Sequence, residues 1–146
     1  MTSCRPRWCA SGTSQAFAND EIAASLSLEL ISKGWDTMQA KHYTSDQRMF
    51  AYLPLMHSEK IEAQNACVLK CKTMMEEKIA ATGSADATMH DMALAHRAVV
   101  AKFGRFPHRN AALGRESTPE ELEWLSSDDI PMWAKSQSTS ASSPPV

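Results

Sequence analysis

Apolar residues recur at helical spacing along most of the chain, beginning near the N-terminus. Residues 16–33 place Ile22, Leu26 and Leu30 at every fourth position, which forms one stripe along a helix. Phe17, Leu28 and Ile31 widen this stripe. Gly34 follows at the position where helices commonly end in a left-handed residue. This pattern predicts an amphipathic helix whose apolar stripe faces a core.

Two further segments, residues 59–81 and 89–103, show the same periodicity. Ser58 precedes the first of them and is a candidate N-cap, and Gly104 follows the second as a candidate stop. Their apolar positions are Ile61, Val68, Cys71, Met75 and Ile79 in the first and Met89, Met92, Val99, Val100 and Phe103 in the second. Both segments are therefore predicted to be helices.

The stretch from Met49 to Met56 is densely apolar and comes closest to a strand pattern, but Pro54 interrupts it. We expect Pro54 to break or kink a helix here. Strand alternation is found nowhere else, so the sequence predicts an all-α fold. Short connections between the helices favour antiparallel helical hairpins. The nine methionines are expected to fill irregular gaps between the helices.

The clearest local signal lies near the C-terminus. Thr118 is a candidate N-cap, with Pro119 in the first helical position and Glu121 at the third, which completes a capping box. A short helix through Leu125 follows from it. The sequence after that is acidic and then rich in Ser and Pro, which predicts a flexible tail. The expected organisation is an irregular segment 1–13, a helical domain 14–126 and a tail 127–146.

Composition excludes several classes of protein. The chain has 146 residues, 43% of them hydrophobic and 22% charged, with a net charge of −2. This balance is ordinary for a globular domain and argues against a surface that binds nucleic acid. The sequence has no apolar run long enough to span a membrane and no secretory signal, so we expect a cytoplasmic protein.

The cysteines offer only a weak metal signal. Cys67 and Cys71 stand one helical turn apart, which would allow half of a metal site. Cys4 and Cys9 lack the spacing of a zinc knuckle, so free thiols that pack as small apolar groups are the preferred interpretation. No metal and no cofactor are predicted.

Positive charge is concentrated in one segment. Residues 97–115 contain five Lys or Arg residues and no acid. Within this segment Gly104 ends a helix and Pro107 prevents its continuation, so the arginines project from a rigid turn. Arginine suits bidentate binding of carboxylate or phosphate. The predicted ligand-binding residues are Arg105, His108, Arg109, Asn110 and Arg115. The alternative is that these arginines pair with acids on neighbouring helices and only brace the fold.

Two histidines are the candidates for catalysis. His57 lies beside Ser58 and Glu59, although Ser58 as a cap and Glu59 at a helix start explain that grouping without chemistry. His96 lies on the apolar stripe of its predicted helix and is expected to point inward. If His57, Glu59 and His96 converge with the arginines, they would form a polar pocket for an anionic metabolite, with a histidine as general base.

Two blocks of sequence resemble a known family. "RMFAYLPLMHSEKIEAQ" and "FGRFPHRNAALGRESTPEELEWL" are similar to the signature blocks of the bacterial family called domain of unknown function 924, over roughly residues 12–125. The resemblance implies a tetratricopeptide-like helical fold and no settled activity, cofactor or substrate. Residues 4–13, "CRPRWCASGT", correspond to a damaged copy of a third motif, and the helices that normally precede it are missing. The resemblance therefore implies a family member that lacks its usual N-terminal portion.

Three functions stay open. The first is a binding or interaction module whose basic corner takes a small anion or an acidic peptide. The second is an enzyme that acts on an anionic metabolite through His57 or His96. In the third, the chain is a truncated family member without a function, and its polar residues only fix the fold. Nucleic acid and membrane partners are not expected.

Overall fold

A computed structural model describes residues 17–38 and 43–138. The protein is all-α, and its internal contacts divide it into two units. The helical unit comprises residues 20–105, and the corner unit comprises residues 17–19 and 106–138. The predicted helical domain 14–126 thus divides after Arg105. The irregular segment predicted at 1–13 and the last eight residues of the predicted tail lie outside the described residues.

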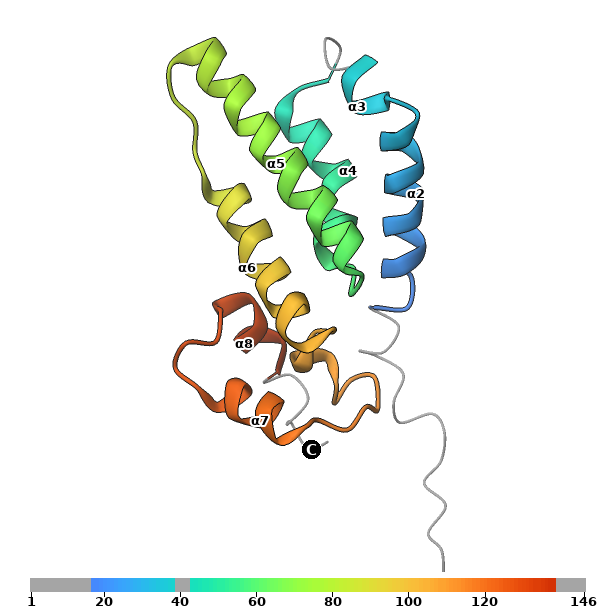
Figure 1. Ribbon diagram of the computed structural model, residues 1–146, viewed down its shortest axis with the longest axis vertical. Coiled ribbons are helices and arrows are strands. Elements are labelled where there is room, and N and C mark those ends of the chain that lie inside the picture. Colours follow the sequence, from blue (N-terminus) through green and yellow to red (C-terminus); the bar gives the residue numbers. More distant parts are fainter. Residues whose placement is uncertain (1–16, 39–42, 139–146) are drawn as a thin grey trace, which may run out of the picture. The chain divides into compact units, whose positions relative to one another are not determined.

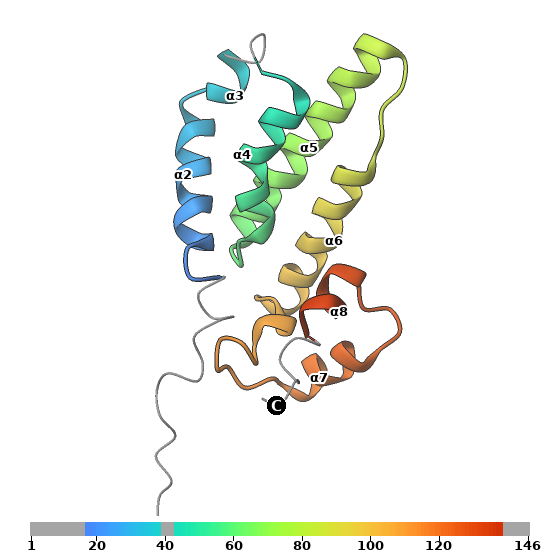
Figure 2. The ribbon, with the colours of Figure 1, turned by 180° about the vertical axis from the view of Figure 1, so that it is seen from behind.

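The helical unit is an up-and-down arrangement of helices. Its elements are α2 (Asp20–Ser32), α3 (Trp35–Met38), α4 (Ser45–His57), α5 (Ile61–Thr82) and α6 (Thr88–Phe103). Figures 1 and 2 show α4 and α5 side by side and antiparallel, with α2 on one side of the pair and α6 on the other. The buried centre of this unit consists of Ala24, Leu55, Met56, Ala63, Cys67, Cys71 and Ala93.

Helix α4 runs through the proline that was expected to break it. A capping box between Thr44 and Gln47 starts the helix, and Pro54 lies inside its last turn. A proline has no backbone N–H, so it removes one hydrogen bond of the helix. In the last turn only a few helical hydrogen bonds follow it, so the helix is little disturbed. Leu55 and Met56, just after the proline, are buried in the core, and this packing offsets the loss. The predicted break at Pro54 is therefore wrong.

The start of α5 also differs from the prediction. The N-cap is Lys60, and no side chain caps the helix. Ser58 instead ends α4, and its Oγ accepts a hydrogen bond from the Lys60 N–H at 3.1 Å. The predicted N-cap role of Ser58 is wrong, because its hydroxyl stabilises the turn between α4 and α5 rather than the helix end itself.

Helix α2 buries one edge of its predicted apolar stripe and exposes the other. Ile22, Leu26 and Leu30 are 62%, 56% and 44% exposed. The small residues Ala24 and Ser27 are buried in the helix–helix contact instead. Leu28 and Ile31, at one edge of the predicted stripe, pack against the core as predicted. The small side chains beside them permit close approach of α2 to α4.

The corner unit is built from short helices around one irregular turn. It contains the 3₁₀ helix η1 (Pro107–Arg109), α7 (Pro119–Ser126) and α8 (Met132–Ser138). The capping box of Thr118 and Glu121 is present as predicted, with Pro119 at the first helical position. In the helical unit, Gly104 ends α6 in the left-handed conformation, with φ 71°, also as predicted.

The C-terminal segment is ordered further than the sequence suggested. Helix α8 lies within the predicted tail, and Ile130 and Ala134 are 6% and 0% exposed. A few apolar side chains among acids and prolines dock this part of the predicted tail on η1. Among the described residues, no helix has the length and apolar character needed to cross a bilayer.

Candidate functional site

The predicted anion-binding corner is buried. In the corner unit, His108, Arg109 and Asn110 are each at most 6% exposed, because η1 carries them into contact with α7 and α8. Arg115 is half-buried. Arg105, by contrast, belongs to the helical unit. The structure therefore groups four of the five predicted residues.

Aromatic rings hold two of these side chains. The guanidinium carbon of Arg109 lies 4.4 Å from the centre of the Phe17 ring and 4.6 Å from that of Phe106. The centre of the His108 ring lies 5.3 Å from that of the Trp133 ring and 5.5 Å from that of the Phe106 ring. A cation against aromatic faces is stabilised by the ring quadrupoles without any anion. Much of the charge predicted to meet a ligand is thus already in contact with protein.

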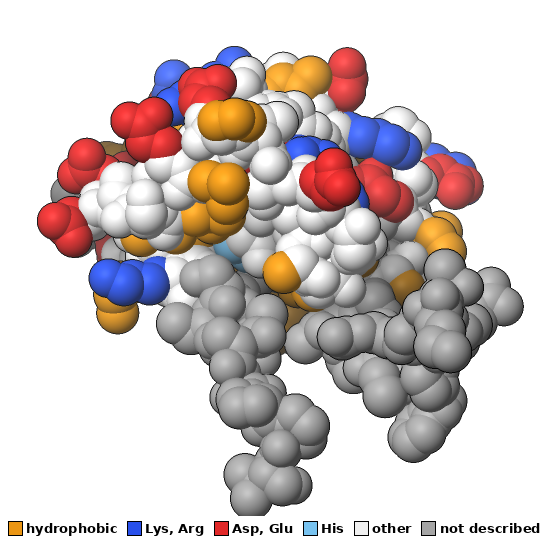
Figure 3. Space-filling model, turned by 90° about the horizontal axis from the view of Figure 1, so that it is seen from below, with side chains coloured by type: hydrophobic (Ala, Val, Ile, Leu, Met, Phe, Trp, Pro, Cys, Tyr) orange, Lys and Arg blue, Asp and Glu red, His pale blue; other side chains and the backbone are white. Residues whose placement is uncertain are grey.

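Hydrogen bonds hold the other two. The Asn110 amide donates to Ser117 Oγ at 3.0 Å and to Glu121 Oε2 at 3.1 Å, so it joins the corner to the capping box of α7. Arg115 Nη2 donates to the carbonyl of Phe106 at 3.2 Å. Every contact just described braces the turn. On the face that Figure 3 shows, basic and acidic side chains of the described residues are interspersed rather than gathered by sign.

The two candidate catalytic histidines do come together. In the helical unit, His57 at the end of α4 and His96 on α6 have ring centres 6.1 Å apart. His96 is buried as predicted, and its Nδ1 donates to the carbonyl of Met92 at 2.8 Å. His57 is exposed. A catalytic role for the pair stays a prediction.

Glu21 is the residue that sequence reasoning missed near this pair. Its carboxylate accepts from Ser58 Oγ at 3.0 Å and from the backbone N–H of Glu59 at 2.9 Å, and Lys60 Nζ lies 3.4 Å away. These contacts fix α2 to the turn after α4. No local signal could have revealed them, because Glu21 lies 37 residues upstream of Ser58.

A buried polar network joins α3, α4 and α5. Tyr52 Oη donates to Asp36 Oδ2 at 3.1 Å, and Lys70 Nζ lies 2.6 Å from the same oxygen. Arg48 pairs with Glu77. Burial raises the pKa of Tyr52 to about 12, so this phenol stays a hydrogen-bond donor at neutral pH. With every charge facing an opposite charge or a donor, the network is suited to holding helices together.

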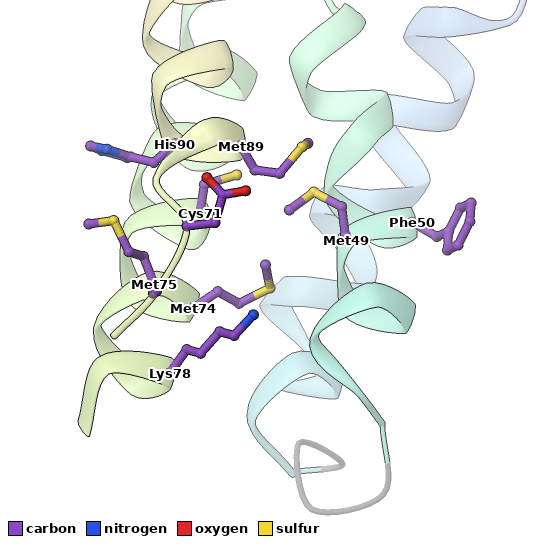
Figure 4. A pocket seen from close by; sticks show the side chains of 10 residues that line it. Met49, Phe50, Cys71, Met74, Met75, Lys78, Met89 and His90 are labelled. Carbon is purple, nitrogen blue, oxygen red and sulfur yellow. The ribbon is translucent and has the colours of Figure 1, made fainter. Parts of the chain in front are cut away.

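A cavity of the helical unit lies elsewhere, between α4, α5 and α6. It has a volume of about 360 Å³. Its lining residues are Met49 and Phe50 of α4, Cys71, Met74, Met75 and Lys78 of α5, Ala85 and Asp86 of the connecting segment, and Met89 and His90 of α6. Figure 4 shows Met49 and Met89 pointing toward each other across the cavity, whereas Phe50 points away from it.

Sulfur dominates this cavity. Met49, Met74 and Met89 come from three different helices, and Cys71 lies beside them. A hydrogen bond between the thiols of Cys67 and Cys71 raises the pKa of Cys67 and lowers that of Cys71. In the described part of the chain, His, Cys, Asp and Glu side chains nowhere gather in groups of three that could hold a metal ion. The number of methionines was the only sequence signal for this cavity.

Comparison with known proteins places the chain in a family. A family model described as bacterial protein of unknown function (DUF924) matches residues 5–129. The chain belongs to the DUF924 family. A solved structure, that of a protein of unknown function from Agrobacterium tumefaciens, is similar to this chain, with 35% sequence identity and a TM-score of 0.63. The match covers 81% of this chain but 58% of that one. No curated protein matches this DUF924 member.

Proposed function

We propose that this DUF924 protein is a binding protein rather than an enzyme, and that the cavity between α4, α5 and α6 takes a small apolar molecule. The observation that carries the proposal is the cavity itself. Its volume of about 360 Å³ falls in the range of small-molecule sites, roughly 300 to 1,000 Å³. Like those sites, it combines a mainly apolar lining with a few polar groups.

The methionines favour binding over simple loose packing. A thioether side chain has three rotatable bonds and a polarisable sulfur, so it adapts its shape to different apolar partners. Three such side chains from three helices would therefore close around a ligand without any backbone movement. An unfilled apolar space of this kind lowers stability, and a ligand that fills it restores the lost contacts.

Binding of unbranched alcohols tests this function. Each methylene that enters an apolar site contributes about 0.8 kcal/mol, so the dissociation constant should fall about fourfold per methylene from butanol to octanol. A Met89→Trp variant, which fills the cavity, should lose this dependence. Met92→Trp is the control, since Met92 lies on the same helix and does not line the cavity. Calorimetry that finds no binding by the parent chain, or equal binding by Met89→Trp, would exclude the cavity as the site.

The anion site predicted from the sequence is a second candidate. It is supported by preorganisation, because Arg109 and Arg115 are held in place and would lose little side-chain entropy on binding. Phosphate or citrate should then raise the melting temperature by a few degrees. Arg115→Met should abolish the increase, and Arg97→Met, in the helical unit, should retain it. The same response in all three proteins would rule out the corner.

A further inference from the structure

The cavity of the helical unit carries a lysine at its lining. Lys78 and Met74 of α5 both line the cavity, and Figure 4 shows the Lys78 side chain directed toward Met74. Its side chain is exposed, and no described acid forms an ion pair with it. The lysine therefore presents a positive charge where the apolar lining meets water.

Asp86, the acid that lines the same cavity as Lys78, already accepts hydrogen bonds from another residue. Asp86, which also lines the cavity, accepts a hydrogen bond from the Thr88 backbone N–H at 2.8 Å and another from the Thr88 hydroxyl. These bonds hold the pKa of Asp86 below its ordinary value, and the charge of Lys78 contributes to the same shift. The Asp86 carboxylate thus binds Thr88, the first residue of α6.

We propose that the ligand of this cavity is an aliphatic monocarboxylate. This inference rests on the proposed function. The alkyl chain lies among Met49, Met74 and Met89, and the carboxylate pairs with Lys78 at the edge. A carboxylate is the simplest group that matches an ammonium at the boundary of an apolar site, since it gains a charge-assisted hydrogen bond there and stays partly hydrated. A primary amine at that place would meet a like charge.

Octanoate, 1-octanol and octylamine share one chain length and differ in the head group. Comparing their affinities therefore distinguishes binding of the alkyl chain from binding of the carboxylate. Calorimetry at neutral pH with the full chain should show octanoate binding about fivefold more tightly than octanol, the gain expected for a partly exposed charge pair. Octylamine should bind least tightly. Lys78→Met should remove the preference for octanoate and leave the affinity for octanol within about twofold.

Lys72→Met is the matched control. Lys72 lies on the same helix, is exposed, and faces Glu76 at 3.7 Å rather than the cavity. The preference for octanoate should survive in this variant. Octanol binding as tightly as octanoate, or a Lys78→Met variant that still prefers octanoate, would overturn the assignment of the ligand while leaving the cavity as the binding site. Failure of all three compounds to bind would overturn the proposed function together with it.

Discussion

The two units of the protein use polar residues in opposite ways. In the corner unit, short helices have little apolar surface to bury, and arginine, histidine and asparagine side chains complete the packing around Phe106. In the helical unit, longer helices form an apolar core, and a gap lined by methionines remains between three of them. The segment richest in motif residues thus uses its polar side chains for packing, whereas the described cavity lies in a segment without such a motif.

This contrast teaches that a dense motif of charged residues is weak evidence for a ligand site. Short helical segments expose backbone groups at both ends and need side chains to satisfy them. Asn110, Thr118 and Glu121 do this work in one connected set of hydrogen bonds. Conversely, a binding cavity requires only space and a suitable lining, which leave no motif in the sequence.

Truncating Phe106, at the centre of the corner unit, should lower the free energy of unfolding more than any other substitution considered below. Phe106 is fully buried and contacts Arg109, His108 and Trp133. Phe106→Ala should therefore lower the free energy of unfolding by about 3 to 5 kcal/mol. Urea titration followed by tryptophan fluorescence measures it. Phe50 is exposed and supplies the control. Phe50→Ala should lower the free energy of unfolding by less than about 0.5 kcal/mol. A Phe106→Ala loss as small as that would mean that the corner does not pack as described.

Breaking the polar network of the helical unit should lower the free energy of unfolding by less than Phe106→Ala does. Asp36→Asn leaves Lys70 and the Tyr52 hydroxyl facing a neutral amide, and we expect a loss of about 2 kcal/mol, since Lys70 is partly exposed and can reach water. The exposed pair of Glu29 and Lys33 supplies the control, where Glu29→Gln should change stability by less than about 0.5 kcal/mol. Equal effects of the two substitutions would show that the network is not buried in solution.

The same network predicts how stability changes in alkali. The pKa of Tyr52 is raised from its ordinary value of 10.0 to about 12, chiefly by burial, so the folded state favours the protonated phenol. Its contribution to stability is complete below pH 10.0 and is lost as the pH rises to about 12. Unfolding free energies of the parent and Tyr52→Phe, measured across this interval, should converge. Parallel curves would contradict a raised pKa.

Loss of a helix cap in the corner unit should have a moderate effect. Thr118→Ala removes the oxygen that accepts from the Glu121 N–H at 3.2 Å, which should lower stability by about 1 kcal/mol. Ser126→Ala, at the other end of α7, removes only an exposed hydroxyl and should be nearly neutral. Thermal unfolding followed by circular dichroism distinguishes the two variants. A neutral Thr118→Ala would show that the corner does not depend on its cap.

The smallest effect is expected on the outer face of α2. Leu26 is 56% exposed, so Leu26→Gln should change the free energy of unfolding by less than about 0.5 kcal/mol. Leu28, two residues further on, packs against the core, and Leu28→Gln should cost about 1 to 2 kcal/mol. Urea titration of the two variants tests which face is buried. The opposite order would mean that Leu26, and not Leu28, faces the core.

Features that depend on a few neighbouring residues could be predicted from the sequence. The end of α6 at Gly104 follows from the freedom of glycine to adopt a positive φ, and the start of α7 follows from Thr118, Pro119 and Glu121. The all-α fold follows from the periodicity of the apolar residues. The inward position of His96 follows from its place on the stripe of α6.

Features that depend on distant residues were decided only by the tertiary structure. It selected Ala24 over Leu26 as the buried face of α2, docked α8 on η1, placed Arg109 between Phe17 and Phe106, and joined Glu21 to the turn after α4. It also left the cavity among three helices. The physical reason is range: caps and turns are determined within about four residues, whereas burial depends on which surfaces from elsewhere in the chain come to cover a side chain.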